Sequence, residues 1–546
     1  MSQRPSRIRI HDSLGRLRSL AEGPEAYDFL NMAEFHAKER ASALVLGLGP
    51  CPARLDELLR KNIPEKAPVY WIECPDFLAA LEQAATTPQI PEQWIRLDLR
   101  SGLQPLIRLL EEQSPALFAY RQARRLFPEF WGPLLAACRL GGTRRERTDK
   151  PRPHGRRTVL LPGSSHDLLY QELRQAFEQE GVTPLPLPGA EGSSLPDPDA
   201  LAALLQEETP EALVSVNIHG LDPEGNVFHL LRAAGVPVCI WFVDNPWQIL
   251  SSLRLPWWKD ALLLTSDASF LPGLRACGAQ RAEFMPLAAS SFFLSPPAAP
   301  LPENVRVLFV GRSRFPDRDA FYAAARRHPL PAERARELLR RGERPDFHWW
   351  KQRIDEIRGR SAPLWPGNEM REYGRGAEEL ALENRLMWLR EAARLGSGEH
   401  PALALVGDED WKKLLCAPAL FLPPVDYYGS LPGLYRAAPF TLDVTSLLLP
   451  GGLTQRHFDV WRAGGFLLTT TGEGMNIFPA ELSEAVLLRR PGDLLHKVKM
   501  LENDEALRES LRCSWQKEIE RKHLYTHRVR AILELAKKLD GASLQV

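Results

Sequence analysis

The sequence predicts an α/β protein made of three doubly wound domains, a smaller one followed by two larger ones that face each other. Short apolar runs of strand length alternate with amphipathic segments of helix length, which is typical of parallel sheets covered by helices. The chain has 546 residues, which is too long for a single hydrophobic core. A basic stretch and a proline-rich stretch divide it into three segments.

Residues 1–145 are predicted to form the first domain, with strands in "ASALVLGLGP" (41–50) and in "APVYWIE", which ends at Glu73. The turn "VLGLGPCP" has the position of a nucleotide- or S-adenosylmethionine-binding loop, and Glu73 that of a ribose carboxylate. Gly47 and Gly49 are followed by two prolines, which lack the N–H donors that such a loop needs. The sequence therefore favours a structural turn. The basic run "RLGGTRRERTDKPRPHGRRT" that follows is interpreted as a linker rather than a nucleic-acid patch, because it lacks interleaved aromatic residues.

Residues 157–298 are predicted to form the second domain. Its expected strands are "RTVLLPGSSH" (157–166), "ALVSVNIHG" (212–220), "VPVCIWFVDNP" (236–246), "ALLLTSD" (261–267) and "AEFMPLA" (282–288). The proline-rich segment "LSPPAAPLPEN" (294–304) predicts a stiff boundary after it.

Residues 303–546 are predicted to form the third domain. Its expected strands are "VRVLFVGRSRF" (305–315), "ALALVGD" (402–408), "APFTLDVT" (438–445), "GFLLTT" (465–470) and "AVLLRR" (485–490). The segment 316–401 is too long for a simple crossover and predicts a helical insertion, and long helices are expected at the C-terminus.

The composition excludes several classes of partner. Lys+Arg and Asp+Glu both number 69, so net charge favours neither nucleic acid nor a membrane surface. The first twenty residues contain no apolar core of a secretory signal, and we expect no membrane span. The seven cysteines are scattered without a CxxC pair, which favours reduced thiols in a cytoplasmic protein without structural zinc.

His219 and Asp244 are the candidate catalytic residues. They follow adjacent predicted strands of the second domain, in "SVNIHG" and "WFVDNP". Ligands of such sheets bind at the carboxyl ends of the strands, and an imidazole or carboxylate there can take a proton from an acceptor hydroxyl. The alternative for each is a polar residue that only satisfies a loop backbone.

Candidate ligand-binding residues come from the third domain. Gly311 and Arg312, in "FVGRSRF", would allow a diphosphate to approach and would offset its charge. In "TQRHFDVWRAGGFLLTT", Arg456 and Asp459 are three residues apart on a predicted helix, ahead of Gly464 and Gly465. We expect the arginine to meet phosphate and the carboxylate to meet ribose hydroxyls. The alternative is a surface ion pair.

A family resemblance rests on "GSLPGLYRAAPFTLDVTSLLLPGGLTQRHFDVWRAGGFLLTT", with "LRRPGDLLHKVKMLEND" and "HLYTHRVRAIL" after it. Together they resemble the glycosyltransferase group 1 superfamily, and within it the branch of CgeB-like proteins. "VPVCIWFVDNP" looks like the acceptor lobe of that branch. The resemblance covers about residues 157–535, and the first domain resembles the extra domain of some bacterial flagellin glycosyltransferases.

The resemblance implies a GT-B fold and sugar transfer from a nucleotide-diphosphate sugar to the hydroxyl of a protein or glycan acceptor. It implies no cofactor other than the donor and no obligatory metal. By position, Asp459 matches the carboxylate that holds the donor ribose, and Gly464 and Gly465 match the family glycines. A second carboxylate of many relatives is replaced here by Gly451.

Three functions remain open on the sequence alone. The first is the glycosyltransferase, and the second is a non-catalytic nucleotide- or carbohydrate-binding protein with the same fold, which the glycine at position 451 favours. The third is an N-terminal methyltransferase fused to the other two domains. The acidic triplet "DPD" (197–199) is interpreted as a turn rather than a metal ligand set.

Overall fold

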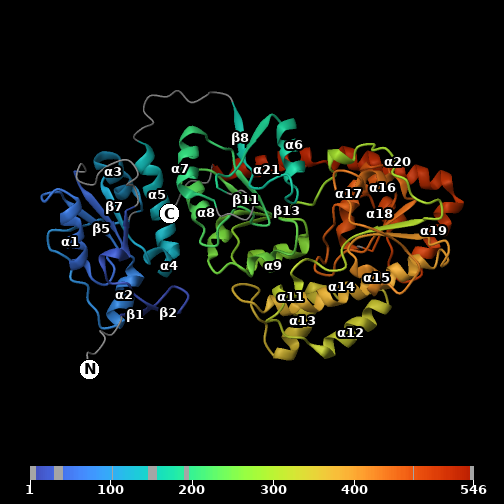
Figure 1. Ribbon diagram of the computed structural model, residues 1–546, viewed down its shortest axis with the longest axis horizontal. Helices are drawn as coiled ribbons and strands as arrows, with labels where there is room; N and C mark the ends of the chain where they lie inside the picture. Colours follow the sequence, from blue (N-terminus) through green and yellow to red (C-terminus); the bar gives the residue numbers. More distant parts are fainter. Residues whose placement is uncertain are drawn as a thin grey trace.

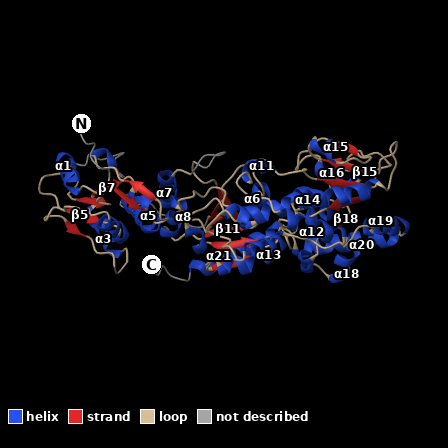
Figure 2. Cartoon of the chain, turned by 90° about the horizontal axis from the view of Figure 1, so that it is seen from below, coloured by secondary structure: helices blue, strands red, loops and turns tan. Residues whose placement is uncertain are grey.

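The computed structural model describes residues 8–29, 41–100, 102–144, 156–189, 196–470 and 472–540. Three α/β units follow one another along the long axis of the molecule, each with its own sheet (Figures 1 and 2). The predicted fold class is confirmed. The centre of the predicted basic linker, residues 145–155, lies outside the described residues, and residues 139–144 still belong to a helix.

The first domain is a five-stranded sheet in the order β3-β7-β4-β5-β6, in which β3 alone runs antiparallel to its neighbour. Its strands are β3 (Tyr27–Phe29), β4 (Ala43–Leu46), β5 (Val69–Ile72), β6 (Ile95–Arg96) and β7 (Ala116–Tyr120), beside a hairpin of β1 (Arg9–His11) and β2 (Leu17–Ser19). Its helices are α1 (Pro52–Asn62), α2 (Pro75–Gln83), α3 (Gln104–Gln113), α4 (Ala123–Leu126) and α5 (Pro128–Arg144).

The second unit, which we call the middle lobe, is a six-stranded parallel sheet in the order β13-β12-β11-β10-β8-β9. Its strands are β8 (Arg157–Leu160), β9 (Val182–Leu185), β10 (Leu213–Val216), β11 (Val238–Phe242), β12 (Leu262–Thr265) and β13 (Arg281–Phe284). Its helices are α6 (Tyr170–Gln179), α7 (Pro198–Glu207), α8 (Asn226–Ala233), α9 (Pro246–Leu250) and α10 (Leu271–Ala276). The central strands β11 and β12 are buried along their whole length because helices cover both faces.

Helix α5 joins the first domain to the middle lobe, where it lies beside α7 and α8 (Figure 1). At Gly132 of α5, an added methyl group would come within 2.4 Å of the His229 ring on α8, so only glycine permits this close contact.

The third unit, the C-terminal lobe, is a five-stranded parallel sheet in the order β16-β15-β14-β17-β18. Its strands are β14 (Val307–Val310), β15 (Leu403–Val406), β16 (Leu420–Leu422), β17 (Phe440–Asp443) and β18 (Leu467–Thr469). Its helices are α15 (Asp410–Leu414), α16 (Leu431–Ala437), α17 (Arg456–Arg462), α18 (Ala480–Val486), α19 (Asp493–Asn503) and α20 (Glu505–Lys522).

Short 3-10 helices occur in all three units, at Pro24–Ala26, Pro256–Asp260, Ala268–Phe270, Ser291–Phe293 and Glu473–Ile477.

One predicted strand of this lobe, "AVLLRR" (485–490), is wrong. Helix α18 runs to Val486, and only Leu487 makes a single bridge, to Thr469.

The segment between β14 and β15 is helical, as predicted, with α11 (Arg318–Phe321), α12 (Pro329–Arg340), α13 (Phe347–Arg358) and α14 (Met370–Ala393). It shares an apolar core with the middle lobe, which includes Trp247 of α9 and Trp350 of α13. The Trp365 indole N–H also donates to the Leu253 carbonyl (3.0 Å). The insertion therefore bridges the two lobes.

The C-terminal helix α21 (Tyr525–Asp540) does not stay with the C-terminal lobe, unlike the predicted boundary of 303–546. It packs on α6 of the middle lobe. The Ala289 N–H donates to the His523 carbonyl (2.7 Å), and the Arg528 guanidinium donates to the Leu287 carbonyl (3.0 Å).

Candidate functional site at the junction of the two lobes

The carboxyl ends of β11 and β12 in the middle lobe meet a loop of the C-terminal lobe. The Asn245 side-chain amide donates to the Leu448 carbonyl (3.0 Å), and the Asp267 carboxylate accepts from the Gly451 N–H (2.9 Å). Because ligands of doubly wound sheets bind at the carboxyl ends of the strands, this junction is the candidate ligand-binding site.

His219 and Asp244 lie in the loops after β10 and β11, at this edge of the middle sheet. Asn217 connects the two loops, because its amide donates to Asp244 Oδ2 (2.8 Å) and accepts from the Val243 N–H (3.0 Å). His219 Nε2 lies 4.0 Å from Asp167 Oδ2. The sequence predicted that His219 and Asp244 lie at this edge, and it did not single out Asn217 or Asp167.

Asp244 is exposed at the surface, but protein atoms surround its carboxyl closely enough to change its pKa. Surrounding protein desolvates the Asp244 carboxyl and raises its pKa, while the hydrogen bond from Asn217 acts in the opposite direction. Asn217 and Ile218 both have positive φ, 51° and 61°, which is unusual for residues other than glycine. Such backbone strain is concentrated at functional sites.

The backbone of the loop after β14 is held by hydrogen bonds from neighbouring residues, whereas the side chain of Arg312 in this loop is exposed. The Trp411 indole donates to the Gly311 carbonyl (2.8 Å), and the Ser313 backbone N–H donates to Asp408 (2.7 Å). Arg385 of α14 donates to the Ser313 carbonyl (2.9 Å). Arg312 is exposed and has no ion pair among the described residues. Gly311 is thus used for packing, whereas Arg312 remains accessible.

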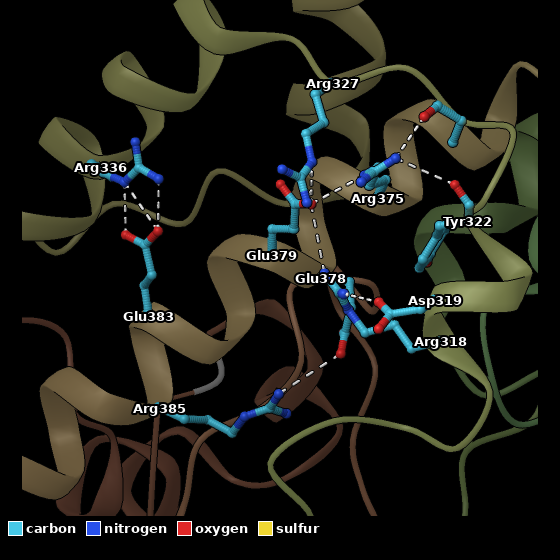
Figure 3. A network of polar contacts seen from close by, with 11 residues as sticks. Arg318, Asp319, Tyr322, Arg327, Arg336, Arg375, Glu378, Glu379, Glu383 and Arg385 are labelled. Carbon is cyan, nitrogen blue, oxygen red and sulfur yellow. Dashed lines mark hydrogen bonds and ion pairs between the residues drawn. The ribbon is translucent and has the colours of Figure 1, made fainter. Parts of the chain in front are cut away.

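Further arginines around α14 are paired with glutamates rather than open to a ligand (Figure 3). Arg336 donates to the Glu383 carboxylate through its Nε and Nη2 groups, with a shortest distance of 2.8 Å. Arg375 and Arg318 lie 3.1 Å and 3.7 Å from Glu379. This network connects α11 and α12 to α14 within the insertion.

Arg456 points to the carboxyl ends of β14 and β17. Its Nε donates to the buried Asp443 carboxylate (2.6 Å) and its Nη1 donates to the Val310 carbonyl (3.0 Å). Burial alone would raise the pKa of Asp443, but Arg456, His457 and the Thr445 hydroxyl outweigh it and hold that pKa below its ordinary value. Arg456 therefore compensates a buried charge.

His457 is a structural residue of the same helix. Its Nδ1 accepts from the Thr454 N–H (3.1 Å) and its Nε2 lies 2.8 Å from the Thr469 hydroxyl. Burial lowers the pKa of His457, while the nearby Asp443 carboxylate acts in the opposite direction.

Asp459 does not share an open face with Arg456, which corrects the predicted joint ligand site. The carboxylate is 1% exposed and accepts from the Ser290 N–H (2.9 Å) and the Tyr427 hydroxyl (2.5 Å). Burial raises its pKa to about 8. The Ser290 backbone and the Tyr427 side chain thus make the hydrogen bonds that were predicted for ribose hydroxyls.

The two glycines after α17 also have structural reasons. Gly464, with φ +85°, ends the helix in the left-handed region that favours glycine. A methyl group at Gly465 would lie 2.4 Å from the Tyr435 carbonyl oxygen of α16. Close packing rather than approach of a ligand explains this pair.

Arg344, in the loop between α12 and α13, is a candidate that the sequence reasoning missed. Its Nη1 contacts the Thr470 carbonyl (3.4 Å), while its Nε and Nη2 are buried without a hydrogen-bond partner among the described residues. Burial lowers its pKa, against the opposing influence of Asp346, Asp443 and Asp267. A buried guanidinium with unpaired N–H groups fits an anionic ligand such as a phosphate.

Gly451, the position where many relatives of the resembling family have a carboxylate, faces Asp267 of the middle lobe. A methyl group at Gly451 would lie 3.2 Å from the Asp267 carboxylate. The other lobe therefore supplies a carboxylate to this place.

The glycine-rich turn of the first domain is filled by its own side chains. A methyl group at Gly49 would lie 2.6 Å from the Tyr27 hydroxyl, and Glu73 accepts from the Leu48 N–H (2.6 Å) and the Cys74 N–H (2.8 Å). Burial raises the pKa of Glu73 to about 8.

The acidic triplet at 197–199 begins α7, where Asp197 caps the helix by accepting from the Asp199 and Ala200 N–H groups.

Within the described ranges, no group of three or more His, Cys, Asp or Glu side chains could hold a metal ion. No helix in the same part of the chain is long and apolar enough to cross a membrane.

Two parallel α/β lobes that meet at the ends of their strands define the GT-B class of folds, here preceded by a third α/β domain. Residues 385–534 match a family model described as glycosyl transferase-like. This match includes Arg456, Asp459, Gly464 and Gly465, and it leaves out the middle lobe with His219. A comparison with curated proteins finds no match.

Several solved structures are similar at low identity. They include T4 phage β-glucosyltransferase (8% identity, TM-score 0.36, covering 70% of this chain and 99% of that one). They also include Anabaena HepE in complex with UDP-glucose (11%, 0.37, 71% and 100%). A putative UDP-N-acetylglucosamine 2-epimerase from Listeria monocytogenes is similar as well (10%, 0.33, 71% and 98%). At these values no function is transferred from them.

Proposed function

We propose that the protein is a glycosyltransferase that moves a sugar from a nucleotide-diphosphate sugar to an acceptor hydroxyl. The observation that carries the proposal is the glycosyl transferase-like match of residues 385–534, because this segment forms most of the lobe whose strand ends meet the middle lobe. In this proposal, arginines of the C-terminal lobe and its insertion bind the donor diphosphate. A residue of the middle lobe accepts the proton of the acceptor hydroxyl.

The donor diphosphate is assigned to Arg312 and Arg344. Arg312 is accessible at the end of β14, and Arg344 has two N–H groups without a partner among the described residues. Both would offset the negative charge that develops on the leaving diphosphate. Arg456 acts indirectly, since its charge is already engaged by Asp443.

The acceptor hydroxyl is assigned to Asp244 or His219. The acceptor oxygen forms a bond to the anomeric carbon while the bond from that carbon to the diphosphate oxygen breaks. The diphosphate leaves with the electron pair, and the hydroxyl proton passes to the base. The raised pKa of Asp244 brings this carboxylate closer to the operating pH, which favours it as the base.

The finer features are part of the same proposal. They are membership of the CgeB-like branch, transfer of a hexose without a metal, a cytoplasmic location, and a protein or glycan acceptor such as flagellin. All of them rest on the sequence resemblance and on the scattered cysteines.

The test is a screen of nucleotide sugars against the purified full chain. A donor that binds only the folded protein raises the melting temperature, and radiolabelled donor then reports turnover. Arg344→Ala should abolish the thermal shift, whereas Arg340→Ala, an exposed arginine of α12 without an ion pair among the described residues, should preserve it. If no nucleotide sugar shifts the melting temperature or turns over, the proposal is wrong.

A second candidate is a non-catalytic nucleotide- or carbohydrate-binding protein with this fold. The enclosure of Asp459 by Ser290 and Tyr427 favours it, because the predicted ribose carboxylate is not open. Thermal stabilisation by a nucleotide sugar without any turnover would support this candidate.

A further inference from the structure

A cavity of about 940 Å³ lies between the first domain and the middle lobe. On one side it is lined by the carboxyl ends of β4 and β7, at Leu46 and Tyr120, and by α4 and α5. On the other side it is lined by the middle-lobe loops at 223–224 and 252–255. Its volume is that of a pocket for a small organic ligand.

The lining is strongly basic. Only two acidic side chains, Asp28 and Glu224, belong to the described lining. The lining contains seven arginines, Arg16, Arg18, Arg121, Arg124, Arg125, Arg139 and Arg254.

Some of this charge is neutralised within the protein. Arg16 and Arg18 share Asp12 (2.9 and 3.1 Å), and Arg121 pairs with Asp28 (2.7 Å). Arg139 lies 2.9 Å from Asp199, whose side chain is 77% exposed.

Three arginines remain without an acidic partner among the described residues. Arg124 and Arg125 belong to α4 of the first domain, and Arg254 belongs to the middle lobe, where its one described contact is to Asn368 at 3.4 Å. Unpaired like charges around one hollow repel each other, and a bound anion would relieve that repulsion.

The chemistry of the ligand follows from the side chains. Guanidinium groups bind phosphate oxygens through two parallel hydrogen bonds, and they keep their charge at any physiological pH. The glycine turn of this domain is packed by Tyr27 and does not offer its backbone to a ligand. A ligand at this edge would therefore be held by side chains from both domains.

We propose that this cavity binds a small molecule carrying a diphosphate, held between Arg124 and Arg125 on one side and Arg254 on the other. This site is separate from the donor site of the proposed function and does not depend on it. A ligand bound there would contact both the first domain and the middle lobe.

The experiment is calorimetry on the full chain with inorganic pyrophosphate as the probe, at low ionic strength. The parent protein should bind it, and the Arg124→Ala/Arg125→Ala double variant should bind at least about tenfold more weakly, because each lost contact is a charge-assisted hydrogen bond. Arg254→Ala, on the other wall, should weaken binding in the same direction. ADP and UDP, titrated next, tell whether a nucleoside adds affinity.

Two controls separate this site from other basic groups. Arg108→Ala removes an exposed arginine of α3 that does not line the cavity, and it should bind pyrophosphate like the parent. Arg312→Ala removes the proposed donor-site arginine and should also retain this binding. The proposal is overturned if the parent does not bind pyrophosphate, if Arg108→Ala loses as much affinity as the double variant, or if only Arg312→Ala loses it.

Discussion

Replacing Arg456 with alanine should destabilise the C-terminal lobe strongly, because Asp443 would lose its ion-pair partner and keep only the Thr445 and Thr454 hydroxyls as donors. The Asp443 side chain is 0% exposed, and Arg456 Nε lies 2.6 Å from its carboxylate. Removing one partner of such a buried pair costs about 3–5 kcal/mol, since the remaining charge is neither solvated nor compensated. Urea unfolding followed by tryptophan fluorescence measures this loss.

A second substitution tests the reason for the loss. Asp443→Asn in the Arg456→Ala background removes the uncompensated charge, so the double variant should be more stable than Arg456→Ala alone. Arg489→Ala, which breaks an ion pair with Glu484 at the protein surface, should leave the unfolding midpoint nearly unchanged. If Arg456→Ala behaves like Arg489→Ala, or if Asp443→Asn brings no recovery, the role assigned to the buried charge is refuted.

Three further predictions concern other parts of the two lobes. Asp459 has a folded-state pKa of about 8, above its ordinary 3.8, so the native state holds a proton that the unfolded state releases. The parent should therefore lose stability as pH rises from about 4 to about 8. Asp459→Asn should show a flatter dependence of melting temperature on pH in that window, and an unchanged slope would contradict the assignment. Gly465→Ala should cost about 1–3 kcal/mol by overpacking against the α16 carbonyl 2.4 Å away. Gly472→Ala, with nothing within 4 Å, should be neutral in the same denaturation assay. Asp244→Asn or His219→Ala should lower turnover while donor affinity by calorimetry stays near that of the parent. Transfer at the parent rate by both variants would show that the base lies elsewhere.

Most strands of the two lobes were predictable because buried parallel strands form continuous apolar runs in the sequence, but β9 (Val182–Leu185) and β16 (Leu420–Leu422) were not predicted. β11 in "VPVCIWFVDNP" and β14 in "VRVLFVGRSRF" are buried along most of their length. The same reasoning failed at "AVLLRR", since a short apolar run also suits the buried side of a helix such as α18. β7 (Ala116–Tyr120) was missed, although "ALFAY" is a run of the same kind.

The candidate site was less predictable than the fold, because its geometry depends on residues distant in sequence. Helical spacing correctly placed Arg456 and Asp459 on one helix, but it could not tell that Ser290 and Tyr427 would enclose Asp459. Arg344 could not be predicted from its neighbours in the sequence. Its guanidinium is buried by folding and comes near Asp443 and Asp267, which are distant in sequence. The positions of His219 and Asp244 could be predicted because the carboxyl end of a buried strand is recognisable in the sequence.

The return of α21 to the middle lobe means that the chain crosses between the two lobes twice, at Ala289 and at His523, with the two crossings bonded to each other. The C-terminal lobe is thus an insert within the middle lobe. During synthesis from the N-terminus, the helix α21 that completes the middle lobe is made only after the whole insert. The insert is therefore free to fold before its host is finished. The paired crossings and the helical insertion, which shares an apolar core with the middle lobe, then connect the two lobes at two separate places.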